Sequence, residues 1–212
     1  MDQITPSRIN HSLNICVNPA ALIPESVSDL TGLTNELLEN QPRFSSKTVQ
    51  LISAFLENLP QPYCLVAHNG FKYDFPLLNA EFHKVGIGNL DCYILDSLQA
   101  LKIILEYPED MKEEGKALEK KPRLRDTTDN YMRAGPQTSD LSTNPKDTAG
   151  NARSSFSLES LHQKIFGVKP KKVHGAEQDV HSLIRVCASR ADLFVKYSRQ
   201  HFGRLSSVKR MW

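Results

Sequence analysis

The chain lacks the features that direct a protein to or through a membrane. No apolar run in the 212 residues approaches the ~18 residues that a membrane-spanning helix needs. The first residues, Met-Asp-Gln-Ile-Thr-Pro, do not have the basic-then-apolar order of a secretory signal. From these absences we expect a soluble, intracellular protein with no membrane segment, located in the nucleus, the cytoplasm or both.

The chain also lacks paired cysteines and a strong charge of one sign. Its four cysteines are far apart and form no Cys-x-x-Cys motif, so we expect free thiols in the core of an intracellular protein. Basic residues number 26 and acidic residues 24, which leaves a net charge of +2. Overall charge therefore gives no argument for a polyanionic partner, which would have to meet a local basic patch.

What the sequence does contain fits one globular domain over residues 1–212. A hydrophobic content of 40% and a charged content of 24% are ordinary for a single domain. The stretch from Glu106 to Arg153 differs, because it is rich in both charges and poor in large apolar residues. Such a segment has no apolar face to bury, so the sequence predicts a mobile insertion there.

Hydrophobic periodicity predicts the elements of the remaining chain. Alternation predicts a half-buried strand over Leu13–Val17, and Thr34 is expected to cap a short helix that buries Leu37 and Leu38. A loop is expected over residues 28–34. Further helices are expected over 47–59, 75–85, 97–106 and 158–166, followed by one long last helix that begins at 176 and is completed by 192–201. Strands are expected at 64–67 and 93–96.

One short stretch contains three successive patterns, those of a strand, a turn and a helix. An apolar run, Cys64–Ala67, is followed by turn residues, His68–Gly70, and then by helical spacing from Phe75 onward. Asp74 lies at the start of that helix, where aspartate is a common cap and Pro76 fits the first turn. The alternative is that Asp74 holds a metal ion, because α/β sheets place their ligands at the carboxyl ends of strands.

Two other aspartates have similar alternatives. Asp96 also ends a strand, but it is more ordinary as a helix cap or loop anchor than as a catalytic acid. Asp179 lies at the edge of an apolar stripe in the helix that begins at 176, where an acid is usually solvated. His174 shortly before it, and Asp74 elsewhere, favour a metal ligand instead. The stripe consists of Ala176, Val180, Leu183, Ile184 and Cys187.

Two motifs resemble those of a known family. The stretch His68–Asp74, His-Asn-Gly-Phe-Lys-Tyr-Asp, resembles the second motif of the DnaQ-like (DEDDh) exonucleases and is most similar to that of the three-prime repair exonucleases. The stretch His174–Asp179, His-Gly-Ala-Glu-Gln-Asp, resembles their third motif. The two motifs occur in the family's order, and their structural context is the test of the resemblance.

The resemblance implies a fold, an activity and a site. The fold would be α/β, a ribonuclease H-like mixed sheet flanked by helices, and the activity a metal-dependent 3′-to-5′ exonuclease acting on DNA ends in repair or degradation. Two ions, Mg²⁺ or Mn²⁺, would be held by Asp74 and Asp179, with His174 as the general base. The family also implies a homodimer formed through sheet edges.

The resemblance further implies contacts to the 3′ end of single- or double-stranded DNA. Leu30 would pack against the terminal base, although an ordinary core role for Leu30 is an equal alternative. The other implied contacts come from the turn and from a basic residue near the next helix. They are His68, Asn69, Lys72, Tyr73 and Arg153.

The sequence departs from the family at the first motif. No aspartate in the chain is followed two positions later by glutamate, so the family's Asp-x-Glu strand is absent. We therefore expect a sheet without its first strand and weak binding of two ions. Two hypotheses stay open, an exonuclease truncated at its front and an inactive form that binds DNA ends or dimerises as a regulator.

Overall fold

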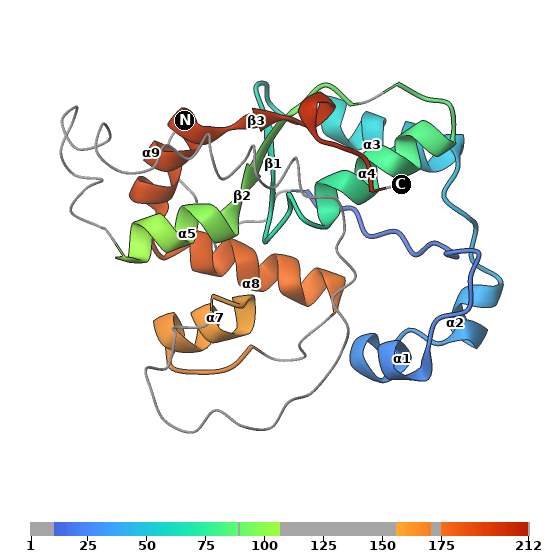
Figure 1. The fold of residues 1–212 in the computed structure, drawn as a ribbon, viewed down its shortest axis with the longest axis horizontal. Helices are drawn as coiled ribbons and strands as arrows, with labels where there is room; N and C mark the ends of the chain where they lie inside the picture. Colours follow the sequence, from blue (N-terminus) through green and yellow to red (C-terminus); the bar gives the residue numbers. More distant parts are fainter. Residues whose placement is uncertain (1–10, 89, 107–155, 171–174, 212) are drawn as a thin grey trace.

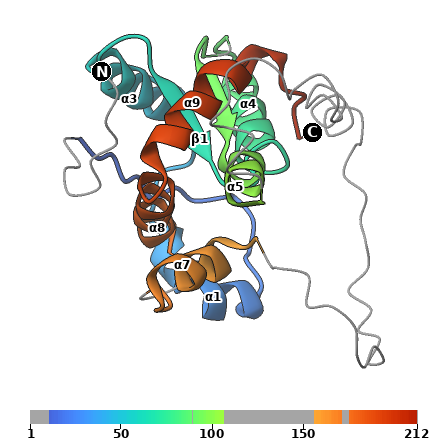
Figure 2. The same ribbon diagram turned by 90° about the vertical axis from the view of Figure 1, so that its left-hand side faces the viewer.

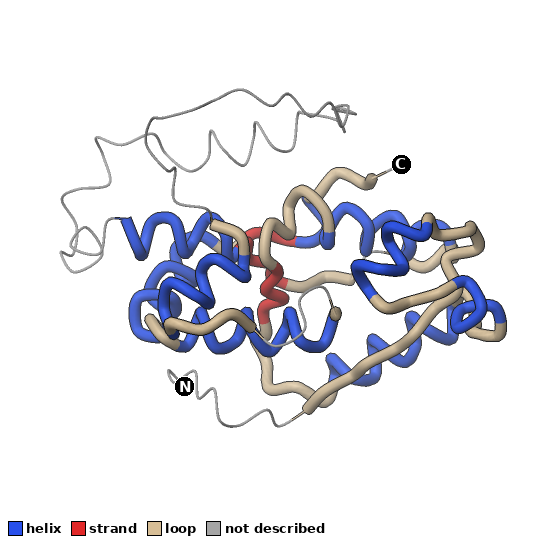
Figure 3. Tube along the Cα trace, turned by 90° about the horizontal axis from the view of Figure 1, so that it is seen from below, coloured by secondary structure: helices blue, strands red, loops and turns tan. Residues whose placement is uncertain are grey.

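The computed structural model describes residues 11–88, 90–106, 156–170 and 175–211. Within them a small sheet lies at the centre, with helices around it (Figures 1 and 3). Residues 107–155 of the predicted insertion lie outside the described residues, and Glu106 at its border is the last residue of helix α5 (Ser97–Glu106).

The sheet has three strands among the described residues, in the order β1 (Cys64–Ala67), β2 (Tyr93–Asp96) and β3 (Gly203–Arg204). β1 and β2 are parallel, whereas β2 and β3 are antiparallel. The predicted α/β class with a mixed sheet and flanking helices is confirmed. Parallel pairing also brings the carboxyl ends of β1 and β2 to one edge, where Ala67 pairs with Asp96.

Helices cover one face of the sheet with the larger apolar core. Leu95 of β2 is buried there together with residues of α5, α7 (Leu158–Phe166), α8 (Ala176–Ala188) and α9 (Ala191–His201). α7 packs beneath α8 in Figures 1 and 2. The predicted limits of α7 are confirmed, because the Ser157 side chain caps it and Gly167, with φ 73°, ends it.

The opposite face carries α4 (Asp74–Lys84) and the 3₁₀ helix η1 (Leu205–Ser207). Ile94, Phe75 and Leu205 are buried in the cluster between them. The predicted helix over 47–59 is confirmed as α3 (Ser46–Glu57), which lies beside α4 in Figure 1. β3 and η1 had no sequence prediction. The single long helix predicted from 176 to 201 is wrong, because α8 ends at Ala188 and α9 begins at Ala191.

The predicted loop over 28–34 is wrong at residues 28–31, because helix α1 occupies Glu25–Thr31, and it is confirmed at 32–34. The N–H groups of Val27 and Ser28 donate to the Pro24 carbonyl, and Gly32, with φ 74°, ends the helix. α1 contains no buried residue. Local hydrogen bonds therefore form this helix without the apolar face that periodicity detects.

The short helix predicted after Thr34 is confirmed as α2 (Asn35–Glu39), with the Thr34 side chain accepting from the N–H of Leu37. Leu38 is buried as predicted, but Leu37 is 59% exposed. The predicted strand over Leu13–Val17 is wrong, since those residues have no regular structure. A strand needs a neighbour for its backbone groups, and the described residues provide only an isolated bridge nearby, from Asn18 to Arg43.

All four cysteines are free, as predicted. Their predicted location in the core is wrong for two of them, because Cys16 and Cys64 are exposed while Cys92 and Cys187 are buried. β1 is likewise not fully buried, since Cys64 and Val66 are both exposed. None of the helices in the described part of the chain is long and apolar enough to cross a membrane.

Candidate metal and nucleic-acid site

The turn between β1 and α4 is fixed by backbone hydrogen bonds and close packing. Asn69 has a φ of 60°, a left-handed conformation that asparagine tolerates better than most residues. The N–H of Lys72 donates to the Asn69 carbonyl at 3.1 Å, and the N–H of Phe75 donates to the Gly70 carbonyl at 2.9 Å. A Cβ at Gly70 would lie 2.7 Å from side-chain atoms of Ala67 and Phe75, so this position requires glycine.

Asp96 ties this turn to β2. Its side chain is 3% exposed, and its carboxylate accepts the N–H groups of Asn69 at 2.9 Å, Phe71 at 3.2 Å and Leu98 at 2.9 Å. The prediction of a helix cap or loop anchor is confirmed, because Asp96 is both. Burial raises the pKa of Asp96, and the three backbone donors oppose that rise. The protein's own backbone uses this carboxylate, which gives it a positioning role.

His68 fastens the turn to two further elements. Its Nε2 lies 2.9 Å from the carbonyl oxygen of Phe156 and its Nδ1 lies 3.0 Å from Oγ of Ser97. A carbonyl only accepts, so Nε2 carries the hydrogen, and a neutral ring then accepts the Ser97 hydroxyl at Nδ1. Burial lowers the pKa of His68, which favours this neutral form. Both ring nitrogens are thus engaged within the chain.

Asp74 opens α4 at the carboxyl end of β1. It is the first helical residue rather than the cap, because Tyr73 occupies the cap position. Asp74 is exposed, but neighbouring protein atoms partly desolvate its carboxyl group. This desolvation is the main reason why the pKa of Asp74 is raised, with Asp96 adding to the rise. A carboxylate short of hydration and beside a second acid is favourably placed to bind a cation.

Asp179 lies in the first turn of α8, where its N–H donates to the Gly175 carbonyl at 2.9 Å. The buried positions Ser182 and Val186 follow one and two turns later, so Asp179 shares the covered face of the helix. The predicted stripe is wrong at Ala176 and Val180, which are both exposed. The observed face places Asp179 in line with the buried residues rather than at their edge.

Asp74 and Asp179 fit a divalent cation by their chemistry. Carboxylate oxygens are the ligands that Mg²⁺ and Mn²⁺ prefer, and neither side chain forms an ion pair with another described residue. Across the described ranges, no three or more His, Cys, Asp or Glu side chains gather closely enough to hold a metal. Predicted His174 lies outside those ranges.

Comparison with known proteins identifies relatives over nearly the whole chain. No protein-family model matches it. It is 32% identical over 211 residues to three-prime repair exonuclease 1 of Bos taurus, which covers 98% of this chain and 55% of the relative. It is 31% identical over 187 residues to three prime repair exonuclease 2 of Homo sapiens, covering 87% of this chain and 64% of the relative. The chain is a homologue of the three-prime repair exonucleases.

This homology confirms the resemblance predicted from the two motifs. A shorter match, 29% identical over 101 residues, is to the 3′-5′ exonuclease DinG of Bacillus subtilis, and it covers 48% of this chain and 10% of that protein. The chain spans 55% to 64% of the length of the three-prime repair exonucleases cited above.

The predicted nucleic-acid contacts of this exonuclease homologue fall in two places. Tyr73 is 50% exposed in the turn before α4, and Nζ of Lys72 lies 5.1 Å from the centre of its ring. Leu30 is 52% exposed on α1, so the alternative of a core residue is wrong. Arg153 lies outside the described residues. Contact of these side chains with DNA stays a prediction.

Sequence reasoning missed Asn79, which holds α4 from its buried side. Asn79 is 1% exposed, and its Nδ2 donates to the carbonyls of Leu205 and Val208, both at 2.9 Å. Ser97, the partner of His68, was also missed. The signal available for Asn79 was an asparagine in the middle of a helix, where that residue is a weak helix former.

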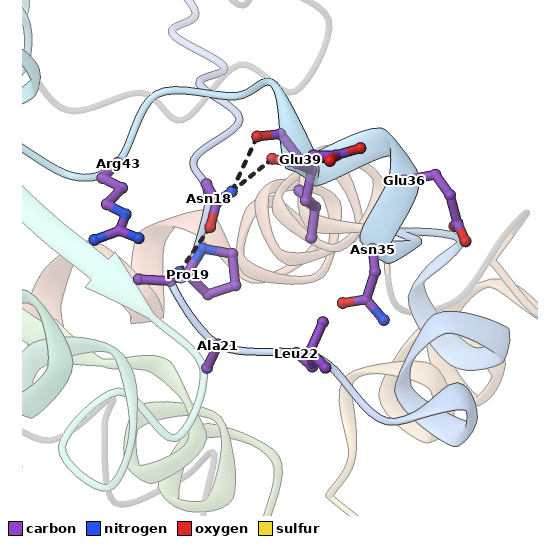
Figure 4. Close-up of a pocket in the computed structure, with 10 residues that line it drawn as sticks. Asn18, Pro19, Ala21, Leu22, Asn35, Glu36, Glu39 and Arg43 are labelled. Atoms are coloured by element: carbon purple, nitrogen blue, oxygen red, sulfur yellow. Dashed lines mark hydrogen bonds between the residues drawn. The ribbon is translucent and has the colours of Figure 1, made fainter.

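The structure also has a cavity of about 450 Å³. None of the predicted metal-binding or nucleic-acid-binding residues lines it. It is lined by residues 18–22, by side chains of α2 and by Arg43 (Figure 4). The Asn18 amide closes one side by donating to the carbonyls of Leu38 at 2.9 Å and Glu39 at 3.4 Å. These bonds fasten the N-terminal segment to α2.

Proposed function

We propose that the chain is the core of a metal-dependent 3′-to-5′ exonuclease that removes nucleotides from DNA ends. The observation that carries the proposal is the position of Asp74, exposed at the end of a turn that buried Asp96 holds rigid. A rigid turn positions a ligand accurately. The names of the relatives, three-prime repair exonucleases, support the reaction.

Each residue has a stated role in this proposal. Asp74 and Asp179 would hold Mg²⁺ or Mn²⁺, which when bound stabilises the negative charge that develops on the phosphate. His174 takes the proton from the attacking water. The side chains of Asn69, Lys72, Tyr73 and Leu30 hold the terminal nucleotide, while Arg153 contacts phosphate and His68 keeps the turn in place. Such contacts carry little sequence information.

A second candidate function is binding of DNA ends, or pairing with a partner subunit, without cleavage. The absence of an Asp-x-Glu pair from these residues favours it, because Asp74 and Asp179 are two carboxylates where the family has four. Sedimentation over a range of concentrations tests the homodimer that either candidate predicts.

The two candidates are separated by one assay with 5′-labelled single-stranded DNA that carries a free or a blocked 3′ end. Exonuclease activity gives products shortened from the free end with Mg²⁺, lost with a chelator and in Asp74→Asn. Asp192→Asn is the matched control, since Asp192 is exposed in the first turn of α9. Tighter binding of the free end without shortening supports the second candidate. If neither shortening nor tighter binding is observed, both candidates are overturned.

A further comparison separates the metal ligand from the base. Asp179→Asn weakens a metal site, which a higher concentration of Mn²⁺ partly refills, whereas His174→Ala removes a proton acceptor that no metal replaces. Both variants should slow cleavage by orders of magnitude, with more rescue by Mn²⁺ for Asp179→Asn. Equal rescue of the two would contradict the assigned roles.

A further inference from the structure

Residues 205–211, the C-terminal strap, run along α4 toward its first turn (Figure 1). Leu205 and Val208 anchor the strap, being 1% and 7% exposed and bonded through their carbonyls to the buried Asn79. Further along, the N–H of Met211 donates to the carbonyl of Pro76 at 3.2 Å. The strap is therefore fixed at both ends against the helix that begins with Asp74.

Two basic residues lie between these fixed points. Lys209 and Arg210 are exposed, and neither forms an ion pair with another described residue. Met211 contacts Pro76, which lies within one helical turn, about 5.4 Å of axial rise, of Asp74. Lysine and arginine have long flexible stems, so both charges extend from the strap into solvent near the first turns of α4.

We propose that Lys209 and Arg210 bind phosphates of the nucleic-acid backbone as it enters the site at Asp74. The net charge of +2 gives no general attraction to DNA, so local cations near the site must supply it. The strap supplies them on a backbone that is already ordered, which reduces the entropy lost on binding. This inference rests on the proposed function and adds a substrate-binding surface to it.

The test measures the salt dependence of DNA binding by the full chain in the presence of a chelator, which prevents cleavage. The probe is a labelled single-stranded oligodeoxynucleotide with a 3′ hydroxyl. Each phosphate contact contributes about 0.7 to the slope of log affinity against log salt, so Lys209→Ala/Arg210→Ala should reduce the slope by about 1.4. Lys47→Ala/Lys84→Ala, which removes two exposed charges from α3 and the far end of α4, should leave it unchanged.

The outcomes separate the strap from the proposed function. An unchanged slope with binding retained overturns the strap contact and leaves the proposed function standing. An equal change in both double variants also overturns it, because the effect is then one of overall charge. No binding by the unsubstituted chain overturns the strap contact, and together with no shortening of DNA in the Mg²⁺ assay it overturns the proposed function as well. Lys209→Gln/Arg210→Gln, which keeps a polar side chain at each position and removes its charge, must repeat the loss, with circular dichroism showing that the fold is retained.

Discussion

Two regions of the molecule carry predicted contacts to the terminal nucleotide, and they are held in different ways. The turn after β1 is held by Asp96 of the neighbouring strand, through bonds across 27 and 25 residues of sequence. The α1–α2 region is held by bonds to the chain segment that precedes it, including those from the Asn18 amide to the carbonyls of Leu38 and Glu39. Asn35 exchanges two hydrogen bonds with the backbone of Ile23, at 3.0 and 3.1 Å, and α1 buries nothing.

The difference separates two tasks. A metal ligand such as Asp74 must be held within a fraction of an ångström, and buried polar bonds from distant residues do this. A side chain that packs on the face of any base, as proposed for Leu30, does not need one exact geometry, so it tolerates some movement. Local stability should therefore be high around Asp74 and low around Leu30.

The largest effect is expected for Asp96→Ala. The substitution leaves three backbone N–H groups in a buried place without an acceptor, at about 1–3 kcal/mol for each donor that water cannot reach. We expect a loss of about 3 kcal/mol or more in the free energy of unfolding, measured with urea. The control is Asp29→Ala on exposed α1, which should change the free energy of unfolding by less than about 0.5 kcal/mol. Equal losses would abolish the distinction between the regions.

A smaller loss is expected for Asn79→Ala, which removes two hydrogen bonds from a buried amide. At about 1 kcal/mol for each bond, the loss should be about 2 kcal/mol. Amide hydrogen exchange should rise at Leu205 to Val208 and in the first turn of α4. Asn58→Ala removes an exposed bond to the Ala54 carbonyl and should have little effect on stability. A similar result for both variants would mean that the strap does not stabilise α4.

Leu30→Ser should change the free energy of unfolding by no more than about 0.5 kcal/mol, because the side chain is half exposed on a helix without a core. Binding of a free 3′ end should nevertheless weaken, measured by fluorescence anisotropy. Leu51→Ser, at an equally exposed position of α3, is the control for both measurements. A large loss of stability in Leu30→Ser would show that α1 is packed more firmly than its exposure indicates.

The smallest effect is expected for Asp74→Asn, whose free energy of unfolding should differ from that of the unsubstituted chain by an amount that depends on pH. The pKa of Asp74 is raised in the folded protein, so its ionisation opposes folding above that pKa. This cost disappears as pH falls through the raised pKa to below the ordinary value of 3.8. Asp74→Asn should thus be slightly more stable than the unsubstituted chain at neutral pH and equal to it in acid, by urea unfolding. Asp192→Asn should show no gain.

Elements that depend on nearby residues could be predicted from sequence. The strand over 93–96 and the helix over 97–106 follow from an apolar run and an Asp-Ser junction, and they match β2 and α5. Thr34 and Ser157 were recognised as caps because a cap bonds within three residues of itself. The turn before α4 was predicted for the same reason.

Features that depend on distant partners could not be predicted. Nothing around Asn79 in the sequence indicates that its amide meets carbonyls at Leu205 and Val208. His68 was predicted from its motif to contact nucleic acid, whereas its ring bonds Ser97 and Phe156, which lie 29 and 88 residues away in sequence. The apolar alternation at Leu13–Val17 had the pattern of a strand but no partner in the described residues.

The hydrogen bonds of Asn79 also constrain the order in which the chain acquires its structure. Its partners lie 126 and 129 residues further along the sequence, so α4 is synthesised long before the segment that fixes it. Synthesis proceeds from the N-terminus at roughly 5–20 residues per second, so the strap is completed several seconds or more after Asp74 has been synthesised. Nascent chains stalled before Leu205 should therefore show rapid proteolysis within α4, and the full 212-residue chain should not.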